Sequence, residues 1–424
     1  MILPNNKPQR ENRLMQIERE VHAEAREWER QRLEKRLQKE ADRDGRVFPR
    51  SQRKAQQRRD TVIPLRSGVG VVKVIVCYGW DPDREQWGCP MRERWGLRPR
   101  QELSPALEDR LAFTITTTSS YRDAAALAEK WLGEPVDDST LHDLTQRLGE
   151  RAEEQLQERL KSLPQELTPQ RAASELAIFE LDGWQARYRG PGFGKKKTKK
   201  KRVEWHEVKL GVFYFQEQAA RTGKDRGMIS EKVVVSWAEE GGTELGRRLH
   251  WEAVRRGVGR AKHILVLGDG APWIWSVAKD RWLGATELLD FYHASEHVWA
   301  LGKALYGEDH AKEWVESRLH ELRHGQENEF LEKIAQVEVP RGKRGKTIRK
   351  ERKYFPKRAK RLNYQQIAAR GWPIGSGAVE SACNGHQGRF KRRGQFWTKP
   401  GLRNLAALKQ ARENNYWDEL WFAA

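Results

Sequence analysis

The order of strand-like and helical segments between residues 175 and 300 restricts the fold more than any other feature of the sequence. Apolar runs rich in β-branched and aromatic residues predict strands at 175–183, 203–215, 232–237, 263–270 and 287–293. Helical patterns separate the third run from the fourth and the fourth from the fifth. Three strands, a helix, a strand, a helix and a strand predict an α/β domain built on a central sheet.

Three carboxylates occupy positions in this pattern where they could meet. Asp182 ends the first run, Asp269 follows the fourth, and Glu380 lies just inside a helix predicted to begin after the N-cap Ser376. Carboxylates gathered at a sheet edge repel one another unless cations lie between them. We therefore expect two Mg²⁺ or Mn²⁺ ions, which oxygen ligands select over zinc. Such a pair activates a water or a 3′-hydroxyl for in-line attack on a phosphodiester.

The helix that carries Glu380 also predicts an anion-binding patch. A period of 3.6 residues places Asn384, Gln387 and Lys391 on the same face as Glu380. The basic residues at the end of this stretch are Arg389, Lys391, Arg392 and Arg393. A metal site beside a polyphosphate is one interpretation of the stretch. A surface helix with a basic tail is the other.

The charge of the chain favours a polyanionic partner. Its 424 residues include 80 Lys+Arg and 60 Asp+Glu, a net charge of +20, and nucleic acid is the common partner of so basic a protein. Residues 341–361 hold 12 basic residues and one acid, Glu351, and form either a phosphate clamp or a disordered linker. A second basic run, which is also typical of a solvated loop, joins the first two strands. It comprises Lys195, Lys196, Lys197, Lys199, Lys200, Lys201 and Arg202.

The first 103 residues predict a long helix followed by a small β segment. Residues 13–42 carry a sparse apolar stripe at helical spacing, and we expect a helix that pairs either with a copy of itself or with its own chain. A basic linker over 43–60 then leads to a hairpin around Ser67 and Gly68. Cys77 and Cys89 supply at most half of a closed zinc site, which needs four ligands, so we expect no zinc there.

Residues 104–160 predict three helices, with N-caps at Ser104, Ser120 and Ser139. This pattern is compatible with a helix-turn-helix DNA reader and with a small bundle, and the spacing slightly favours the DNA reader. His293 and His297 are spaced for one helix face, but no HExxH motif surrounds them, so we expect no protein zinc site. Three cysteines and the lack of an apolar run near 18 residues predict a reducing, intracellular setting without a membrane span.

Four motifs resemble those of a known family. They are LDGW at 181–184, GDGAPWIW at 268–275, DFYHASEH at 290–297 and PIGSGAVESACNGHQGRFKRRGQFW at 373–397. Together they are similar to the bacterial insertion-sequence transposases of the ISKra type, which are DDE transposases. The resemblance runs from about residue 104 to about residue 421. It implies a ribonuclease-H-like catalytic domain with a helical insertion, preceded by a helix-turn-helix-like DNA-binding region.

The resemblance also implies roles for individual residues. The catalytic and metal-binding acids would be Asp182, Asp269 and Glu380, with two Mg²⁺ or Mn²⁺ ions per site. Residues near the site would be Asp290, His293, Asn384 and Gln387. The implied substrates are terminal inverted repeats and target DNA, bound by a homodimer in synapsis. The implied setting is the bacterial cytoplasm, in association with the nucleoid.

The sequence divides into six expected segments. They are a helix and linker at 1–60, a degenerate zinc-ribbon-like β segment at 61–103, a helical DNA-binding region at 104–168, the first part of the catalytic core at 172–300, a basic helical insertion at 301–370, and completion of the core at 371–424. Relatives often carry a fuller cysteine cluster than Cys77 and Cys89. The implied function is a transposase that cuts element ends and joins 3′-hydroxyls to target DNA. The alternatives are a silent DNA-binding relic and a structure-selective nuclease.

Overall fold

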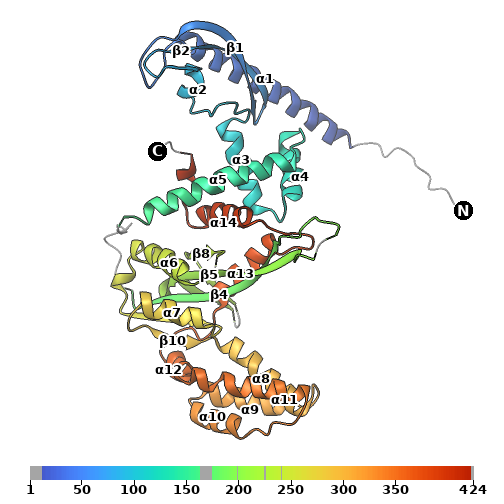
Figure 1. Cartoon of the computed structure of the whole chain (residues 1–424), viewed down its shortest axis with the longest axis vertical. Helices are drawn as coiled ribbons and strands as arrows, with labels where there is room; N and C mark the ends of the chain where they lie inside the picture. Colours follow the sequence, from blue (N-terminus) through green and yellow to red (C-terminus); the bar gives the residue numbers. More distant parts are fainter. Residues whose placement is uncertain (1–11, 163–173, 198, 224–225, 240, 422–424) are drawn as a thin grey trace, which may run out of the picture. The chain divides into compact units, whose positions relative to one another are not determined.

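The computed structural model describes residues 12–162, 174–197, 199–223, 226–239 and 241–421, so the boundary expected between residues 168 and 172 lies outside the described residues. The chain divides into two compact units, Met1–Thr145 together with Asp418–Ala424, and Gln146–Trp417. Figure 1 labels their helices and strands. Within the described ranges, no helix combines the length and the apolar character needed to cross a membrane.

The first unit contains the long helix and the hairpin that the sequence predicts. Helix α1 (Arg13–Asp44) precedes a three-stranded sheet of β1 (Gln56–Ser67), β2 (Gly70–Asp81) and β3 (Gln86–Gly88). The turn after Ser67 is confirmed. The expectation of a linker over 43–60 is wrong at its end, because the main chain pairs with β2 from Gln56 onward.

The two halves of α1 have different surroundings within this unit. Leu33, Leu37 and Ala41 join the apolar core of the hairpin, and Gln38 exchanges hydrogen bonds of 2.9 and 3.1 Å with the main chain of Ile75. Packing on its own chain is therefore confirmed for the second half. The apolar side chains of the first half are exposed: Leu14, Met15, Ile17, Val21 and Trp28. Both hairpin cysteines are buried, and burial raises the pKa of the thiols of Cys77 and Cys89.

Helices of different lengths follow the sheet. They are α2 (Pro90–Arg94), α3 (Pro105–Thr117), α4 (Tyr121–Leu132) and α5 (Asp138–Arg159). The caps predicted at Ser104 and Ser120 are confirmed, because their hydroxyl oxygens accept hydrogen bonds from the N–H groups of Leu107 and Asp123. Helix α5 begins one residue before the predicted cap Ser139, and the division between the two units falls within this helix.

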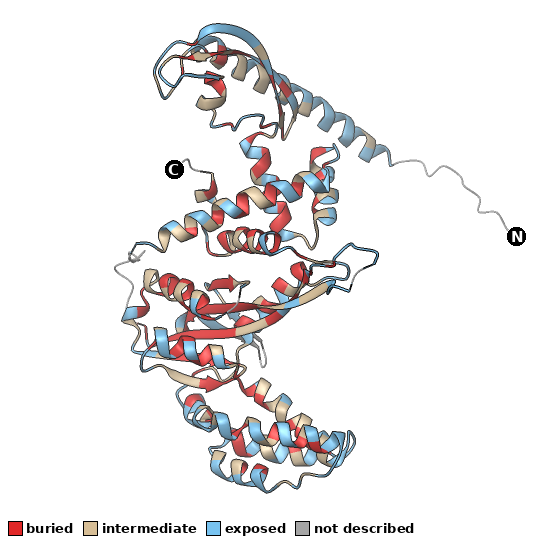
Figure 2. Cartoon of the chain, in the orientation of Figure 1, coloured by how far each residue is buried: buried red, intermediate tan, exposed pale blue. Residues whose placement is uncertain are grey.

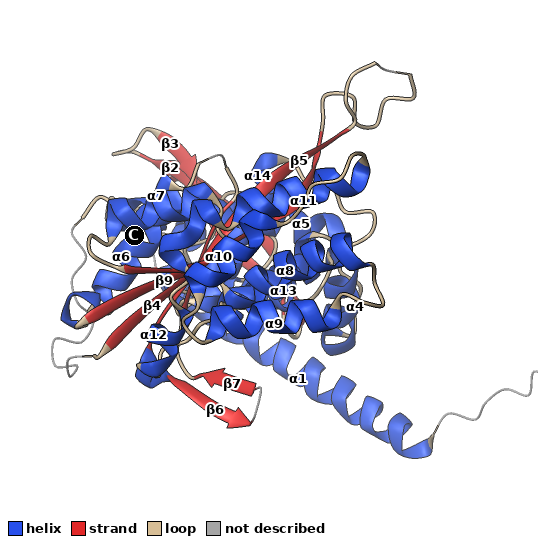
Figure 3. Cartoon of the chain, turned by 90° about the horizontal axis from the view of Figure 1, so that it is seen from below, coloured by secondary structure: helices blue, strands red, loops and turns tan. Residues whose placement is uncertain are grey.

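The second unit is an α/β structure built on a five-stranded mixed sheet. In sheet order the strands are β10 (Thr286–Leu289), β9 (His263–Gly268), β4 (Leu176–Arg189), β5 (Val203–Phe215) and β8 (Val233–Trp237). β10, β9 and β4 run parallel, whereas β4, β5 and β8 are successively antiparallel. The predicted succession of strands and helices is confirmed, but the fifth predicted strand, 287–293, is wrong at its end, because β10 stops at Leu289 and a helix begins at Phe291. The sequence did not predict the separate hairpin of β6 (Ala219–Gly223) and β7 (Arg226–Ile229), which Figure 3 shows apart from the main sheet.

Strand β4 is longer than predicted, and this changes the position of Asp182. The predicted run ends at residue 183, but the antiparallel ladder with β5 continues to the pair Arg189 and Val203. Asp182 therefore lies inside a strand, opposite Leu210. The parallel ladder with β9 is shorter and stops at the pair Leu181 and Gly268, so β4 extends beyond its parallel neighbour from Asp182 onward.

Different helices cover the two faces of the sheet. Phe179 and Leu181 pack in the main core with α6 (Thr243–Arg255) and α7 (Pro272–Arg281). Because side chains alternate along a strand, Glu180, Asp182 and Trp184 belong to the other face. That face carries α13 (Gly377–Phe390) and α14 (Lys399–Glu413), which contact β4 and β8, respectively. Figure 2 shows the strands between these layers as largely buried.

A helical insertion separates β10 from α13, and its first helix begins at Phe291, before the expected boundary at residue 301. Its helices are α8 (Phe291–Tyr306), α9 (Lys312–Arg323), α10 (Glu327–Gln336), α11 (Lys343–Tyr354) and α12 (Tyr364–Ala369), and a 3-10 turn, Pro356–Arg361, precedes α12. Two further 3-10 turns, Gln216–Gln218 and Val258–Arg260, lie in the unit before the insertion. The basic stretch 341–361 thus forms a helix and a 3-10 turn and is not a disordered linker.

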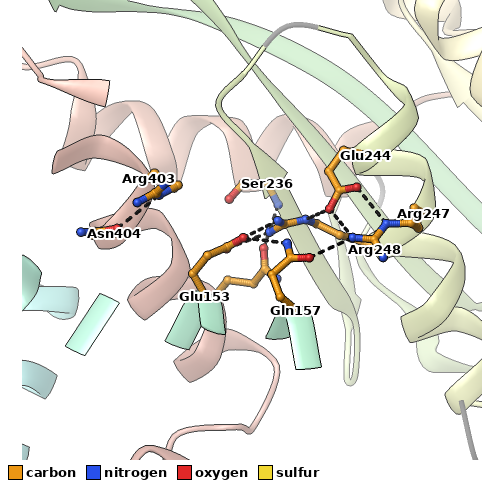
Figure 4. A network of polar contacts seen from close by, with 9 residues as sticks. Glu153, Gln157, Ser236, Glu244, Arg247, Arg248, Arg403 and Asn404 are labelled. Carbon is orange, nitrogen blue, oxygen red and sulfur yellow. Dashed lines mark hydrogen bonds and ion pairs between the residues drawn. The ribbon is translucent and has the colours of Figure 1, made fainter. Parts of the chain in front are cut away.

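A buried arginine of α6 contacts α5 and β8 as well as its own helix (Figure 4). Arg248 on α6 is 3% exposed, contacts Glu153 of α5 at 3.0 Å and contacts Glu244 of its own helix at 2.8 Å. Its guanidinium also lies 4.4 Å from the ring centre of Trp237 on β8. Asn404 of α14 donates to the side chain of Gln146 at 3.1 Å, so the second part of α5 is bonded to both helices.

Candidate functional site

The two predicted aspartates lie at adjoining positions on neighbouring parallel strands. Each follows by one residue the last pair of the β4–β9 ladder, Leu181 with Gly268. The pKa of Asp182 is raised, first by burial and then by the negative charge of Asp269. Asp269 begins the turn into α7, where its carboxylate accepts a hydrogen bond of 2.8 Å from the N–H of Ala271. The parallel pairing therefore brings together acids that are far apart in the sequence.

Helix α13 carries Glu380 to the same face of the sheet. Glu380 is exposed in the first turn of this helix, and the preceding Val379 donates its N–H to Glu180 of β4 at 2.9 Å. One turn later the buried thiol of Cys383 donates a hydrogen bond to Asp182. Burial raises the pKa of this thiol, and the charges of Asp182, Glu380 and Asp269 raise it further. All three predicted acids thus act electrostatically on Cys383.

The donor chemistry fits the expected ions, but the acids are not gathered for coordination. In the part of the chain that the structure describes, no group of three or more His, Cys, Asp or Glu side chains could hold a metal ion. The carboxylate oxygens of Asp182, Asp269 and Glu380 suit Mg²⁺ or Mn²⁺. A cation between Asp182 and Asp269 would relieve the repulsion that raises the pKa of Asp182. Cys383, whose raised pKa keeps it a thiol, contributes no thiolate.

Asp290 bonds the start of the helical insertion to its end. Its carboxylate accepts hydrogen bonds of 2.5 Å from the N–H of His293, and of 2.5 and 2.8 Å from the N–H and hydroxyl of Ser376. Asp290 therefore caps α8 and holds the chain just before α13. The expected capping of α13 by the Ser376 side chain is wrong, because its hydroxyl donates to Asp290 instead.

The histidines of α8 form a polar chain that reaches toward Asp182. The Nε2 atoms of His293 and His297 lie 3.3 Å apart, and the electrostatic interaction with His293 lowers the pKa of Asp182. His297 is paired with the buried Glu351 of α11 and stacks on Tyr354 at 3.6 Å between ring centres. The sequence pattern identified the two histidines, but it did not predict their partners on α11, which are more than 50 residues away.

Asn384 and Gln387 lie further along α13 than Glu380. Asn384 is exposed, and Gln387 accepts a hydrogen bond of 3.2 Å from the Nζ of Lys391. The predicted helical face is confirmed for Gln387 and Lys391, the C-cap residue, because the two side chains meet at the i,i+4 spacing of a helix. Within the part of the chain that the structure describes, neither Asn384 nor Gln387 is hydrogen-bonded to Asp182, Asp269 or Glu380.

The predicted basic residues lie on a projecting hairpin and on the segment beside it. The loop between β4 and β5, shown in Figure 3, exposes the side chains of Lys195, Lys196, Lys197, Lys199, Lys200, Lys201 and Arg202. The main chain of Trp397 pairs with that of Arg187 and Arg189 through hydrogen bonds of 2.9 and 2.8 Å. This pairing brings the segment 391–397 alongside β4. We call residues 195–197, 199–202 and 391–393 together the basic hairpin surface.

Two aromatic and two cationic side chains extend this surface, and the sequence analysis missed them. Trp205 is 53% exposed, and the guanidinium of Arg187 lies 5.9 Å from its ring centre. Arg189 lies 5.2 Å from the ring centre of Phe193. The alternation of Arg187 and Arg189 with apolar residues after Asp182 is a strand signal that would have revealed them. Arg389 differs from the other predicted basic residues, because it is 4% exposed and packs beside Trp397.

Glu180 is a further residue of the site that the sequence analysis did not identify. It is buried on β4, and its pKa is raised from 4.5 to about 7 by burial and by the charge of Asp290. Its position two residues before Asp182 was the available signal, since residues i and i+2 of a strand share a face.

Comparison with known proteins gives a distant structural likeness. No protein-family model matches the chain, and no curated protein matches it. Among solved structures, the Drosophila P element transposase strand transfer complex is similar over 77% of this chain and 81% of that chain. The sequence identity is 11% and the TM-score is 0.25.

Proposed function

We propose that this chain is a DNA transposase of an insertion sequence, with a ribonuclease-H-like catalytic domain of the DDE type. The observation that carries the proposal is the placement of Asp182 and Asp269 one residue beyond the same parallel pair, with α13 bringing Glu380 to that face. The strand order β10-β9-β4-β5-β8, with its directions, supports the ribonuclease-H-like assignment.

Asp182, Asp269 and Glu380 would hold Mg²⁺ or Mn²⁺. Two such ions stabilise the attacking and leaving oxygens of an in-line phosphodiester displacement. The chain's own contribution is placement. The bond from the thiol of Cys383 keeps the Asp182 carboxylate directed toward α13, and the turn at Ala271 fixes Asp269. Glu380 is exposed in the first turn of α13, and its side chain would have to turn toward the aspartates to share a cation with them.

The basic hairpin surface would bind the DNA backbone next to these acids. It lies on β4 itself, the strand that carries Asp182, and on the segment that follows α13. Phosphate contacts of this kind fix the register of the duplex without reading its sequence. We assign the reading of the terminal inverted repeats to the helices α3, α4 and α5, whose short turns suit a helix-turn-helix.

Synapsis of two element ends would use a homodimer. The exposed residues Leu14, Ile17, Val21 and Trp28 of α1 recur at spacings of three, four and seven, which suits pairing with a second copy. Sedimentation of the full chain tests this part of the proposal. Ile17→Glu with Val21→Glu should convert a dimer to a monomer, and a wild-type monomer would refute it.

Cleavage of DNA from the regions that flank the coding sequence tests the function. Asp182→Asn should lower Mg²⁺-dependent cleavage and strand transfer by at least about 10³-fold while DNA binding stays within about twofold. Asp280→Asn, an exposed aspartate on α7, is the matched control and should cleave normally.

Two other outcomes identify the alternative functions. The lack of a ready metal-binding group among the described residues favours a silent DNA-binding relic as second candidate. Binding of these ends by the wild type, without cleavage at any Mg²⁺ or Mn²⁺ concentration, would establish the relic. Cleavage of DNA junctions irrespective of the end sequence would establish a structure-selective nuclease.

A further inference from the structure

A buried carboxylate on the central strand holds the first turn of the helix that carries Glu380. Glu180 is 1% exposed, and its Oε2 accepts a hydrogen bond of 2.9 Å from the N–H of Val379, 199 residues later in the chain. The N–H of Ala378 also donates to this carboxylate. Its Oε1 accepts a hydrogen bond of 2.7 Å from the hydroxyl of Tyr214 on β5.

These bonds replace the cap that a helix normally makes from its own sequence. An N-cap side chain usually accepts from the second or third N–H group of its helix, which in α13 are those of Ala378 and Val379. Ser376 occupies the N-cap position, but its hydroxyl is bonded to Asp290. A carboxyl group offers two oxygen acceptors, whereas a serine cap offers one. α13 is therefore capped from the sheet.

The capping bond joins strand β4, which carries Asp182, to helix α13, which carries Glu380. Glu180 and Asp182 lie two residues apart on the same face of β4, and Glu380 directly follows Val379. We propose that Glu180 is a positioning residue that sets Glu380 against Asp182 and so tunes the affinity of the site for a divalent cation. This inference rests on the proposed function.

A buried carboxylate is a costly way to cap a helix. Moving an ionisable group out of water is unfavourable unless its lone pairs are bonded, whereas a serine cap at Ser376 would carry no such penalty. The hydroxyl of Tyr214 accounts for the oxygen that the helix does not use. The contact therefore fixes one distance, between β4 and the first turn of α13, at the place where the acids must converge.

The test compares Glu180→Ala and Glu180→Gln with Ile178→Ala in the full chain. Ile178 is 1% exposed on the same face of β4, two residues before Glu180, so its truncation controls for lost packing. The first measurement is amide hydrogen exchange of the metal-free protein. Glu180→Ala should raise the exchange rate at residues 378–380 at least about tenfold relative to Ile178→Ala, because the acceptor of two N–H groups is lost.

The second measurement is Mn²⁺ binding, followed by the electron paramagnetic resonance signal of free Mn²⁺. Residues behind a metal ligand typically change affinity by about 10- to 100-fold, so Glu180→Ala should weaken Mn²⁺ binding by about tenfold or more. The Mn²⁺ concentration for half-maximal cleavage should rise in parallel, and Ile178→Ala should change neither. Glu180→Gln, which keeps one oxygen acceptor for Val379 and an amide donor for Tyr214, should recover most of the affinity.

The outcomes separate this inference from the proposed function. Unchanged exchange at residues 378–380 in Glu180→Ala would overturn the capping role. Faster exchange with wild-type Mn²⁺ affinity, or with a loss no larger than that of Ile178→Ala, would reduce Glu180 to a structural cap and overturn the positioning role. Wild-type protein that binds no Mn²⁺, or Asp182→Asn that retains cleavage, would instead overturn the proposed function.

Discussion

The hydroxyl of Tyr354 donates to the main-chain carbonyl of Asp269 across 2.9 Å, although the two residues lie 85 positions apart in the chain. Burial raises the pKa of Tyr354, so the hydroxyl remains a donor at neutral pH. Together with the bond of 2.7 Å from Arg358 to the carbonyl of Gly270, this contact fixes the turn after β9 from the side of the helical insertion.

Tyr354→Phe should therefore loosen the turn that carries the second acid. We expect a loss of about 1 kcal/mol in the free energy of unfolding, the usual contribution of one such hydrogen bond, and slower DNA cleavage. Urea denaturation and a cleavage time course measure the two effects. Tyr306→Phe, which alters an exposed tyrosine of α8, is the control. Equal stability and rate in both variants would show that the Asp269 turn is held without this contact.

Removal of the buried guanidinium of Arg248 should destabilise the second unit strongly. Arg248→Met leaves the half-buried Glu153 without its nearest cation, and the loss of one partner of such a pair costs up to about 3–5 kcal/mol. Arg247→Met removes a more exposed partner of Glu244 and should cost about 1 kcal/mol or less. Chemical denaturation at pH 7 measures both. A similar small cost for the two variants would contradict the network of Figure 4.

The loss of stability in Arg248→Met should depend on pH. Burial alone would raise the pKa of Glu153, but the ion pair with Arg248 outweighs this and lowers it. A carboxylate whose pKa is lowered on folding stabilises the folded state at pH values above its ordinary pKa of 4.5. This contribution is lost as the pH falls through the pKa of the folded state. The stability gap between wild type and Arg248→Met should therefore narrow as the pH is lowered below about 4.5. A gap that widens at acid pH would show the opposite linkage.

DNA affinity should depend steeply on salt. If about six phosphates are neutralised by 341–361 and the basic hairpin surface, the slope of log K against log salt should be about −5. Replacing lysines 195–197 with alanine should reduce the magnitude of this slope from about 5 to about 2, and it should weaken binding to all sequences equally. Fluorescence anisotropy over a salt series measures this. Alanine at Lys161, Lys279 and Lys312 is the control, and equal slopes for the two triple variants would remove the hairpin from the interface.

Stability should fall with rising pH because of Glu180. Its pKa is raised from 4.5 to about 7, mainly by burial, so the folded state holds a proton that the unfolded state has released. This contribution is complete below pH 4.5 and is lost as pH rises toward about 7, a change on the order of 3 kcal/mol. Glu180→Gln cannot ionise and should lack this slope. Parallel pH profiles of unfolding for wild type and Glu180→Gln would contradict the assignment.

The sequence predicts the elements of this chain better than the contacts between them. The succession of strands and helices follows from local periodicity, and the caps at Ser104 and Ser120 follow from side-chain chemistry. The extension of β4 past Gly183 was missed because its register depends on pairing with β5. Ser376 has the chemistry of a cap, but the proximity of Asp290 decides where its hydroxyl bonds.

In the candidate site, too, the sequence predicts local features better than the contacts between distant residues. The types of acid and their positions relative to strands can be predicted, since strand ends and helix starts are local features. The proximity of Asp182 to Asp269 depends on the order in which strands pair, which no local pattern contains. The burial of Arg389 depends on the rotation of α13 about its axis, which Phe390 and Trp397 fix through packing on β4. Glu180 was hidden because it lies within an apolar run.

The helical insertion leaves and rejoins the sheet unit at one place. Asp290 at its start is bonded to Ser376 at its end, 86 residues later, and the N–H of Phe291 donates to the carbonyl of Ile374 at 3.0 Å. The entropic cost of closing a loop grows only slowly with its length. Because its base is closed, the segment can change in length without changing the spacing between β10 and α13.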